Sequence, residues 1–303
     1  MTATPASGPT DGPAAAVAVR RAPMALVTGA FVLLVLLIVV VLLVVKVTRG
    51  TTAAVAPPVT PAPASIVAAA ATVPAVAFDT VGAPAPEGPG PMVLSRQTPL
   101  VIDGKAAVVY VGSEFCPYCA AVRWPLVVAL SRFGTFDHLG ATSSSGNEIF
   151  PGLQTFSFDG ATYRSRYLSL SAVEEYGPAL STTWPDGFAP LEHPTALDQT
   201  LMRHYASAPS APAGSGGATL PFIDIGNRVL MEGADIGFSP GALQSVSMAQ
   251  IASDLSEPTS PVAEAVIGMA NELTAAICAS TGEAPAKVCR SAGVRAGATT
   301  LGL

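Results

Sequence analysis

Charge is scarce in this sequence. Only 12% of its 303 residues are Asp, Glu, Lys or Arg, and the formal net charge is −6. Proteins that bind nucleic acid carry clustered basic residues, and this composition provides no such basic surface. Nucleic acid is therefore not an expected partner. The chain also shows no internal repeat of the kind that builds solenoids.

Histidine and cysteine are also few. The three histidines, His138, His193 and His204, show no ligand-like spacing to either pair of cysteines. Zinc sites of the four-cysteine type need two close pairs, whereas Cys278 and Cys289 have ten residues between them. The sequence therefore predicts no metal site.

The chain has one long apolar run near its start. Residues 22–45 read APMALVTGAFVLLVLLIVVVLLVV and contain no charged side chain. About 20 apolar residues span the hydrocarbon core of a bilayer, whereas a helix on the surface of a globular protein has a polar face. We predict a transmembrane helix over residues 22–47, preceded by a short disordered cytoplasmic tail over residues 1–21.

A cleaved signal peptide is the alternative for this run, because AVA at 54–56 fits the small-residue cleavage pattern. The apolar region of a signal peptide spans about 7–15 residues, and this run is much longer, which favours an uncleaved signal anchor. Positive charges do not orient the span. Arg20 and Arg21 precede it, and Lys46 and Arg49 follow it, so the positive-inside count is a tie.

The residues after the span include few large apolar side chains from which a core could form. From residue 50 to residue 91 the charged residues are Asp79 and Glu87, and the rest is rich in Ala, Pro, Thr and Val. Prolines in such a stretch favour an extended chain. We predict a Pro/Ala-rich linker over residues 48–91 and one folded domain over residues 92–303, a length that suits a single enlarged domain.

Two of the four cysteines stand at a predicted strand-to-helix junction. The stretch AAVVYVGSEF before them is apolar and β-branched, which is typical of a buried strand. The stretch AAVRWPLVVALSRFG after them has apolar residues at helical spacing, with Pro125 inside the pattern. Cys116 and Cys119, in the motif CPYC, therefore open a helix, with Pro117 in its first turn.

The start of a helix suits a reactive thiol. Unpaired N–H groups and the helix dipole favour an anion there, and such cysteines have a pKa below the value of about 8.5 of a free thiol. The thiolate is the species that attacks a disulfide. Cys119, one turn further on, is placed to resolve a mixed disulfide. A purely structural disulfide between Cys116 and Cys119 is the alternative. We expect the nearby charges, Glu114 and Arg123, to face solvent and Trp124 to lie in the core.

The other two cysteines, Cys278 and Cys289, are spaced as CASTGEAPAKVC. We expect a local disulfide, which contributes about 2–3 kcal/mol on the loop-entropy model; two buried free thiols are the alternative. All four cysteines fall into two pairs, and in a domain tethered beyond an apolar span this favours an oxidising compartment. We therefore expect the amino terminus to lie in the cytoplasm and the domain to lie outside it.

The CPYC motif at a β-to-α turn resembles the thioredoxin and glutaredoxin superfamily. That superfamily has a cis-proline loop beside the active cysteines, and ATLPFIDIGNRVLMEGADIG matches it, with Pro221 before an apolar strand and GN as a turn signal. The resemblance implies a cis Pro221 and a backbone at Leu220 that pairs with an incoming chain, with Pro117 and Tyr118 as further substrate contacts. SPGALQSVSMAQIASDLSE then reads as the closing helix.

A wider pattern resembles one thioredoxin-like family, catalogued as domain of unknown function 929. It comprises YVGSEFCPYCAAVRWPLVVALSRFGTF, TFSFDGATYRSRYLSL, AVEEYG, LPFIDIGN and the paired cysteines near the end. The resemblance spans most of residues 92–290 and implies an α/β thioredoxin-like fold. About 105 residues separate Cys116 from Pro221, so we expect a long insertion, about 150–218, between the CxxC helix and the cis-proline strand.

These features predict a membrane-anchored thiol–disulfide oxidoreductase that faces outside the cytoplasm. Cys116 would be the nucleophile, Cys119 the resolving cysteine and Pro221 the backbone platform. The substrates would be exported protein thiols or small thiols, a membrane redox partner would reset the site, and no bound cofactor is required. The alternative is a non-catalytic thioredoxin-fold module that binds or chaperones exported proteins, with a structural disulfide.

Overall fold

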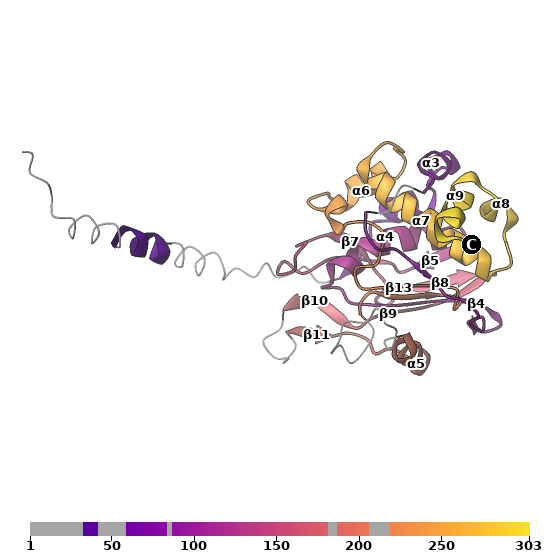
Figure 1. The fold of residues 1–303 in the computed structure, drawn as a ribbon, viewed down its shortest axis with the longest axis horizontal. Coiled ribbons are helices and arrows are strands. Elements are labelled where there is room, and N and C mark those ends of the chain that lie inside the picture. The colour runs from indigo at the N-terminus through magenta and orange to yellow at the C-terminus, as the bar shows by residue number, and fades with distance from the viewer. Residues whose placement is uncertain (1–32, 42–58, 84–86, 181–186, 206–218) are drawn as a thin grey trace, which may run out of the picture. The chain divides into compact units, whose positions relative to one another are not determined.

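The computed structural model describes residues 33–41, 59–83, 87–180, 187–205 and 219–303 (Figure 1). The chain divides into two compact units, residues 1–52 and 53–303. In the first unit, residues 33–41 are helical and their side chains are exposed. The rest of the predicted span over 22–47, and the predicted tail over 1–21, lie outside the described residues, so both stay predictions.

The long apolar helix that the structure describes in full is carboxy-terminal. This is α7, Pro261–Ser280, and 83% of its most apolar window is buried inside the domain. Two earlier helices, α2 (Ala64–Ala71) and α3 (Ala75–Val81), are each too short to cross a membrane. Together they are long and apolar enough, but a 60° bend separates them. Burial on this scale is that of a core helix rather than of a lipid-facing one.

A mixed six-stranded sheet forms the centre of the second unit. Its middle strand, β4 (Lys105–Gly112), pairs in parallel with β9 (Leu168–Glu174) and antiparallel with β12 (Phe222–Ile225). The hairpin partner of β12 is β13 (Val229–Glu232), and β2 (Met92–Val93) lies at that edge. A short strand, β3 (Val101–Ile102), pairs with the start of β4. The predicted α/β class is therefore confirmed, and the sheet is mixed.

Each face of β4 has its own core, because successive side chains of a strand point to opposite faces. Val108 and Tyr110 join the larger cluster, which includes the helices α4 (Pro117–Ser131) and α7. Val109 and Val111 join a smaller cluster with α5 (Ala196–Tyr205). Figure 1 shows α5 on the side of the sheet opposite α7. Coverage on both faces explains why β4 reads as a continuous apolar run.

The expected insertion over about 150–218 is wrong in its extent. β9 lies inside that range, yet it pairs with β4 along its whole length and belongs to the central sheet. Two blocks of short strands lie on either side of β9 in the sequence. Strands β5 (Gly134–Asp137) to β8 (Thr162–Ser165) precede it, and the pair β10 (Tyr176–Leu180) and β11 (Phe188–Pro190) follows it. The serines of LSLSAVE make β9 look like a surface strand in the sequence.

The prediction of an extended linker over 48–91 is wrong for residues 59–83. β1 (Thr60–Pro61) pairs with β6 (Gly140–Ser143), and β6 pairs with β7 (Gln154–Ser157). Helices α2 and α3 pack on the domain, and Ala70, Ala77 and Phe78 are buried. Small alanines allow helices to approach a core closely, and Phe78 supplies the large apolar side chain that fixes the position. The folded domain therefore begins before residue 92.

The predicted closing helix after Phe238 is wrong as a single element. It divides into the 3₁₀ helix η1 (Pro240–Leu243), capped by Ser239, and the helix α6 (Met248–Asp254), capped by Ser247. Ser245 has a φ of 62°, which ends helical geometry between them. The chain then enters α7, and two short helices, α8 (Ala286–Cys289) and α9 (Ala292–Leu301), complete the domain.

Candidate functional site

Cys116 lies where β4 gives way to α4. It is the N-cap of α4, and its Sγ accepts a hydrogen bond from the backbone N of Cys119 at 3.2 Å. Pro117 is buried in the first turn of the helix, where a missing N–H costs no hydrogen bond. A thiol at this point receives the N–H group and the positive end of the helix dipole that favour a thiolate.

The two cysteines of the motif are free thiols with different surroundings. Cys116 is 7% exposed and Cys119 is fully buried. Hydrogen bonding from the Cys119 thiol, then from backbone N–H groups, together with the charge of Arg123, lowers the pKa of Cys116 against the opposing effect of burial. Burial and the neighbouring Cys116 raise the pKa of Cys119 well above its usual value. The thiol of Cys116 therefore ionises more readily than the thiol of Cys119.

The loop before β12 lies against Cys116. The Leu220–Pro221 peptide bond is cis, and the Cys116 Sγ is 3.9 Å from the carbonyl oxygen of Leu220. This proximity follows from the pairing of β12 with β4, which sets Phe222 opposite Val111 at the end of the strand that leads to the cysteines. The structure thus brings Cys116, Cys119, Leu220 and Pro221 together from two segments far apart in the sequence.

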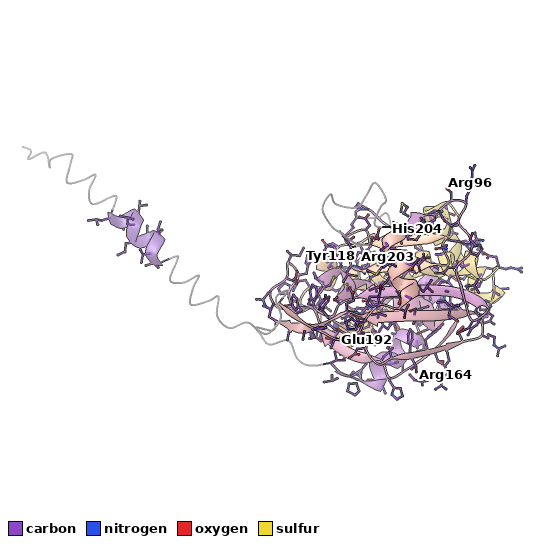
Figure 2. The ribbon with its side chains drawn as sticks, turned by 90° about the horizontal axis from the view of Figure 1, so that it is seen from below. Arg96, Tyr118, Arg164, Glu192, Arg203 and His204 are labelled. Atoms are coloured by element: carbon purple, nitrogen blue, oxygen red, sulfur yellow. A yellow bond between two sulfur atoms is a disulfide. The ribbon has the colours of Figure 1, made fainter. Side chains whose placement is uncertain are left out.

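Aromatic rings flank Cys116 on both sides of it in the sequence. The ring of Phe115 stacks on Phe188 of β11 with centroids 4.0 Å apart, and it lies 6.3 Å from the ring of Tyr176. Tyr118, labelled in Figure 2, is half-buried. Its ring meets the ring of Phe150 edge-on, with centroids 6.2 Å apart. The rings belong to four segments of the chain, so this surface exists only in the folded domain.

A buried charge cluster lies behind the cysteines, and it contradicts the expectation that Glu114 and Arg123 face solvent. Both side chains are fully buried. Arg123 donates from Nε to Glu174 Oε1 at 2.8 Å and from Nη2 to Glu174 Oε2 at 2.6 Å. Glu114 Oε2 lies 3.8 Å from Arg123 Nη2, and Glu114 Oε1 accepts a short hydrogen bond from the hydroxyl of Ser157.

Further contacts hold the guanidinium of this cluster in place. Arg123 donates from Nε to the hydroxyl of Tyr110 at 3.0 Å and from Nη2 to the carbonyl of Ser113 at 2.9 Å. The backbone N of Glu174 donates to Glu192 Oε2 at 2.9 Å. Trp124, as expected, lies in the core.

One guanidinium shares this buried site with two carboxyl groups. Burial raises the pKa of Glu174 to about 8, the charge of Arg123 opposes that rise, and Glu114 adds to it. A second anion in a dry site is costly, so Glu174 retains a proton near neutral pH. Sequence reasoning missed the cluster, although Arg123 is the one charged residue of α4, a sign that it needs a buried partner.

The remaining residues singled out from the sequence lie elsewhere. Cys278 and Cys289 form a disulfide with an S–S distance of 1.99 Å, which joins the end of α7 to α8. Among the residues that the structure describes, no group of three or more His, Cys, Asp or Glu side chains is arranged to hold a metal ion. His138, His193 and His204 are all exposed.

Residues 92–183 match the family model described as "Domain of unknown function (DUF929)". The matched segment contains Cys116, Cys119, Arg123 and Glu174, and it ends before Leu220 and the disulfide. No curated protein and no solved structure matches the chain. The match therefore covers the cysteine pair and the charge cluster behind it, and it carries no statement of activity.

Proposed function

We propose that this protein is a thiol–disulfide oxidoreductase with a thioredoxin-like domain. One observation carries the proposal. The Cys116 thiol caps a helix and accepts a hydrogen bond from the backbone N of Cys119, while the Cys119 thiol is buried one turn below it. Opposite pKa shifts on two adjacent free thiols are what a nucleophile and a resolving cysteine need.

The order of the strands supports the fold assignment. A parallel unit β4–α4–β9 is followed by the antiparallel hairpin β12–β13 and the helix α7, and the strands lie in the order β9, β4, β12, β13. This arrangement agrees with the resemblance to thioredoxins drawn from CPYC and the Pro221 loop. The blocks before and after β9 are additions to that arrangement.

The proposed exchange balances in atoms and electrons. The Cys116 thiolate attacks one sulfur of a substrate disulfide, the substrate S–S bond breaks, and the other substrate sulfur leaves as a thiolate and takes a proton. Cys119 then loses its proton and attacks Cys116 Sγ, and the first substrate sulfur leaves as a thiol. Two electrons pass from the cysteines to the substrate, and the reverse sequence oxidises a dithiol. The charge of Arg123 assists both ionisations.

The surface beside Cys116 suits an extended polypeptide. The half-buried Leu220 places a backbone carbonyl next to the reactive sulfur, and Pro221 holds the loop in which Leu220 lies. Tyr118 and Pro117 flank the sulfur on the helix side. We assign substrate binding to Leu220, Pro117 and Tyr118 and the role of backbone platform to Pro221. Exported protein thiols or small thiols are the substrates, and no bound cofactor is required.

The proposed setting is a membrane. The predicted span over 22–47 would anchor the chain, with the domain outside the cytoplasm and a membrane redox partner to reset the cysteines. The disulfide between Cys278 and Cys289 supports this setting, because structural disulfides persist in oxidising compartments and are rare in the cytosol.

A trapping experiment tests the proposed function. Cys119→Ser stops the exchange at the mixed disulfide, so incubation of the reduced full chain with a disulfide-bonded peptide yields a covalent adduct on Cys116. Cys116→Ser is the matched control and yields none. An adduct on Cys116 that dithiothreitol reverses supports exchange. If Cys119→Ser forms no adduct while it binds the same peptide non-covalently, the chain is a binding or chaperone module instead.

A further inference from the structure

A cavity of about 470 Å³ lies along α7. Residues of α7 spaced three and four apart form one of its walls, and this spacing places them on a single face of the helix. These residues are Pro261, Glu264, Ala265, Gly268, Met269 and Glu272. η1, the residues just before it and Glu87 form the rest. The cavity shares no lining residue with the cysteine site, and its volume is that of pockets that bind small molecules.

The cavity combines apolar walls with carboxylates. Phe238 and Met269 provide the largest apolar side chains. Glu87, Glu264 and Glu272 provide three carboxyl groups, and the lining contains no Lys, Arg or His. Glu87 Oε2 accepts a hydrogen bond from the backbone N of Ser239 at 3.3 Å. The cavity is therefore acidic and has no cation of its own.

Glu272 is the residue that points to a ligand. Its side chain lines the cavity and is only 6% exposed. No hydrogen bond or ion pair joins it to any other residue that the structure describes, and burial alone raises its pKa to about 7. A buried carboxyl group without a partner is costly. A bound cation would supply the missing partner.

We propose that this cavity binds a small organic cation, an ammonium group carried on an apolar body. Glu272 pairs with the ammonium group, Glu264 and Glu87 add negative potential at the rim, and Phe238 and Met269 contact the apolar part. A metal ion fits less well, because no three acidic, histidine or cysteine side chains of the described chain are grouped closely enough to coordinate one.

Calorimetric titration of the full chain tests the proposal with two matched probes. 4-Phenylbutylamine is a cation at neutral pH, and 4-phenylbutan-1-ol has a similar size and shape without the charge. We expect the amine to bind at least about tenfold more tightly than the alcohol, because a hydrogen bond to a charged partner is worth more than a neutral one. Equal binding of the two probes, or no binding of the amine, contradicts the proposal.

Substitutions locate the binding. Glu272→Gln keeps the size of the side chain and removes its charge, so we expect the affinity for the amine to fall at least about tenfold. Glu257→Gln, on an exposed glutamate outside the cavity, leaves the affinity unchanged. Glu264→Gln is a second variant at the rim and gives a smaller loss. An unchanged affinity in both cavity variants overturns the assignment, and so does competition for the site by MgCl₂ alone.

The dependence on pH gives a second readout. The amine favours the ionised carboxylate, so the affinity of the unmodified chain rises as pH increases through about 7, the pKa of Glu272. The other titratable groups that line the cavity are Glu87 and Glu264. The affinity of Glu272→Gln loses this rise. A rise that persists in Glu272→Gln contradicts the role given to Glu272.

Discussion

The sulfur of Cys116 accepts a hydrogen bond from the backbone N–H of Cys119 at 3.2 Å, and the thiol of Cys119 is the largest influence that lowers the pKa of Cys116. The two residues therefore act as one unit. Cys119 keeps its proton and donates, and Cys116 is the thiol that ionises more readily.

This relationship predicts different results for two substitutions of Cys119. Cys119→Ala removes the side-chain donor, so the pKa of Cys116 rises and its alkylation at neutral pH slows. Cys119→Ser keeps a hydroxyl donor, and the pKa of Cys116 stays low. The ultraviolet absorbance of the thiolate, followed against pH, measures both values. Identical titrations of the two variants would show that the side chain of Cys119 does not set the pKa of Cys116.

The buried charge cluster predicts a large effect on stability. Arg123→Met leaves Glu114 and Glu174 buried without their cation, and removal of one partner of a buried pair costs about 3–5 kcal/mol. Arg164→Met is the matched control, because Arg164 pairs with Asp137 at the surface and its side chain is 78% exposed (Figure 2). We expect that substitution to change the free energy of unfolding by less than about 1 kcal/mol. Urea unfolding followed by circular dichroism measures both.

The raised pKa of Glu174 predicts a dependence of stability on pH. Its folded-state value of about 8 exceeds its ordinary value of 4.5, so the folded chain binds this proton more tightly than the unfolded chain does. The contribution to stability is complete below 4.5 and is lost as pH rises towards 8. Asp224 and Glu272 have raised pKa values and act in the same direction.

Comparison with Glu174→Gln isolates the contribution of Glu174 to the pH dependence of the unfolding free energy. In the variant, the fall in unfolding free energy between about pH 5 and about pH 8 is smaller than in the unmodified chain. Parallel curves for the two proteins would show that Glu174 is ionised throughout and that Arg123 outweighs burial.

The early helices predict a test of where the domain begins. Phe78 of α3 is 4% exposed, and its ring lies under the guanidinium of Arg132 at 4.0 Å. Phe78→Ala should reduce the free energy of unfolding by about 3–5 kcal/mol, the usual cost of deleting a buried aromatic ring. Val76→Ala on the same helix removes a side chain that is 67% exposed and should cost far less. Equal small effects would mean that α3 does not belong to the folded unit.

The disulfide predicts an effect on stability without an effect on the reactive thiol. The double variant Cys278→Ser with Cys289→Ser should lose about 2–3 kcal/mol of unfolding free energy, the contribution expected for closing a loop of this size. The rate at which Cys116 is alkylated should not change, since Cys278 and Cys289 lie on α7 and α8 rather than at the cysteine site. Slower alkylation of Cys116 in the double variant would show that the disulfide and the cysteine site are coupled.

The sequence predicted local features better than long-range ones. The buried strand before Cys116, the helix after it and the turn at Gly226 each follow from a short pattern of apolar residues and turn formers. The placement of Glu174 beside Arg123 does not, because 51 residues separate them and the pairing of β9 with β4 brings them together. A charged residue in an apolar helix indicates that a buried partner exists, but the local sequence does not identify which residue it is.

The alanine-rich stretch shows a second limit. Residues 59–83 resemble a linker in composition, because alanine and proline supply little apolar surface and no helical stripe of large side chains. What they pack against decides their structure. Asn271 of α7 donates from Nδ2 to the carbonyl oxygens of Phe78 and Gly82 at 2.9 and 2.7 Å, and no local pattern reveals that contact.

The rate of alkylation of Cys116 against pH tests the central proposal most directly. The reduced full chain is treated with iodoacetamide over a range of pH, with Cys116→Ser as the control for other sites. We predict an inflection clearly below the value of about 8.5 of a free thiol, and its loss in Cys116→Ser. Alkylation of Cys116 only at higher pH, or only after denaturation, would contradict catalytic thiol–disulfide exchange.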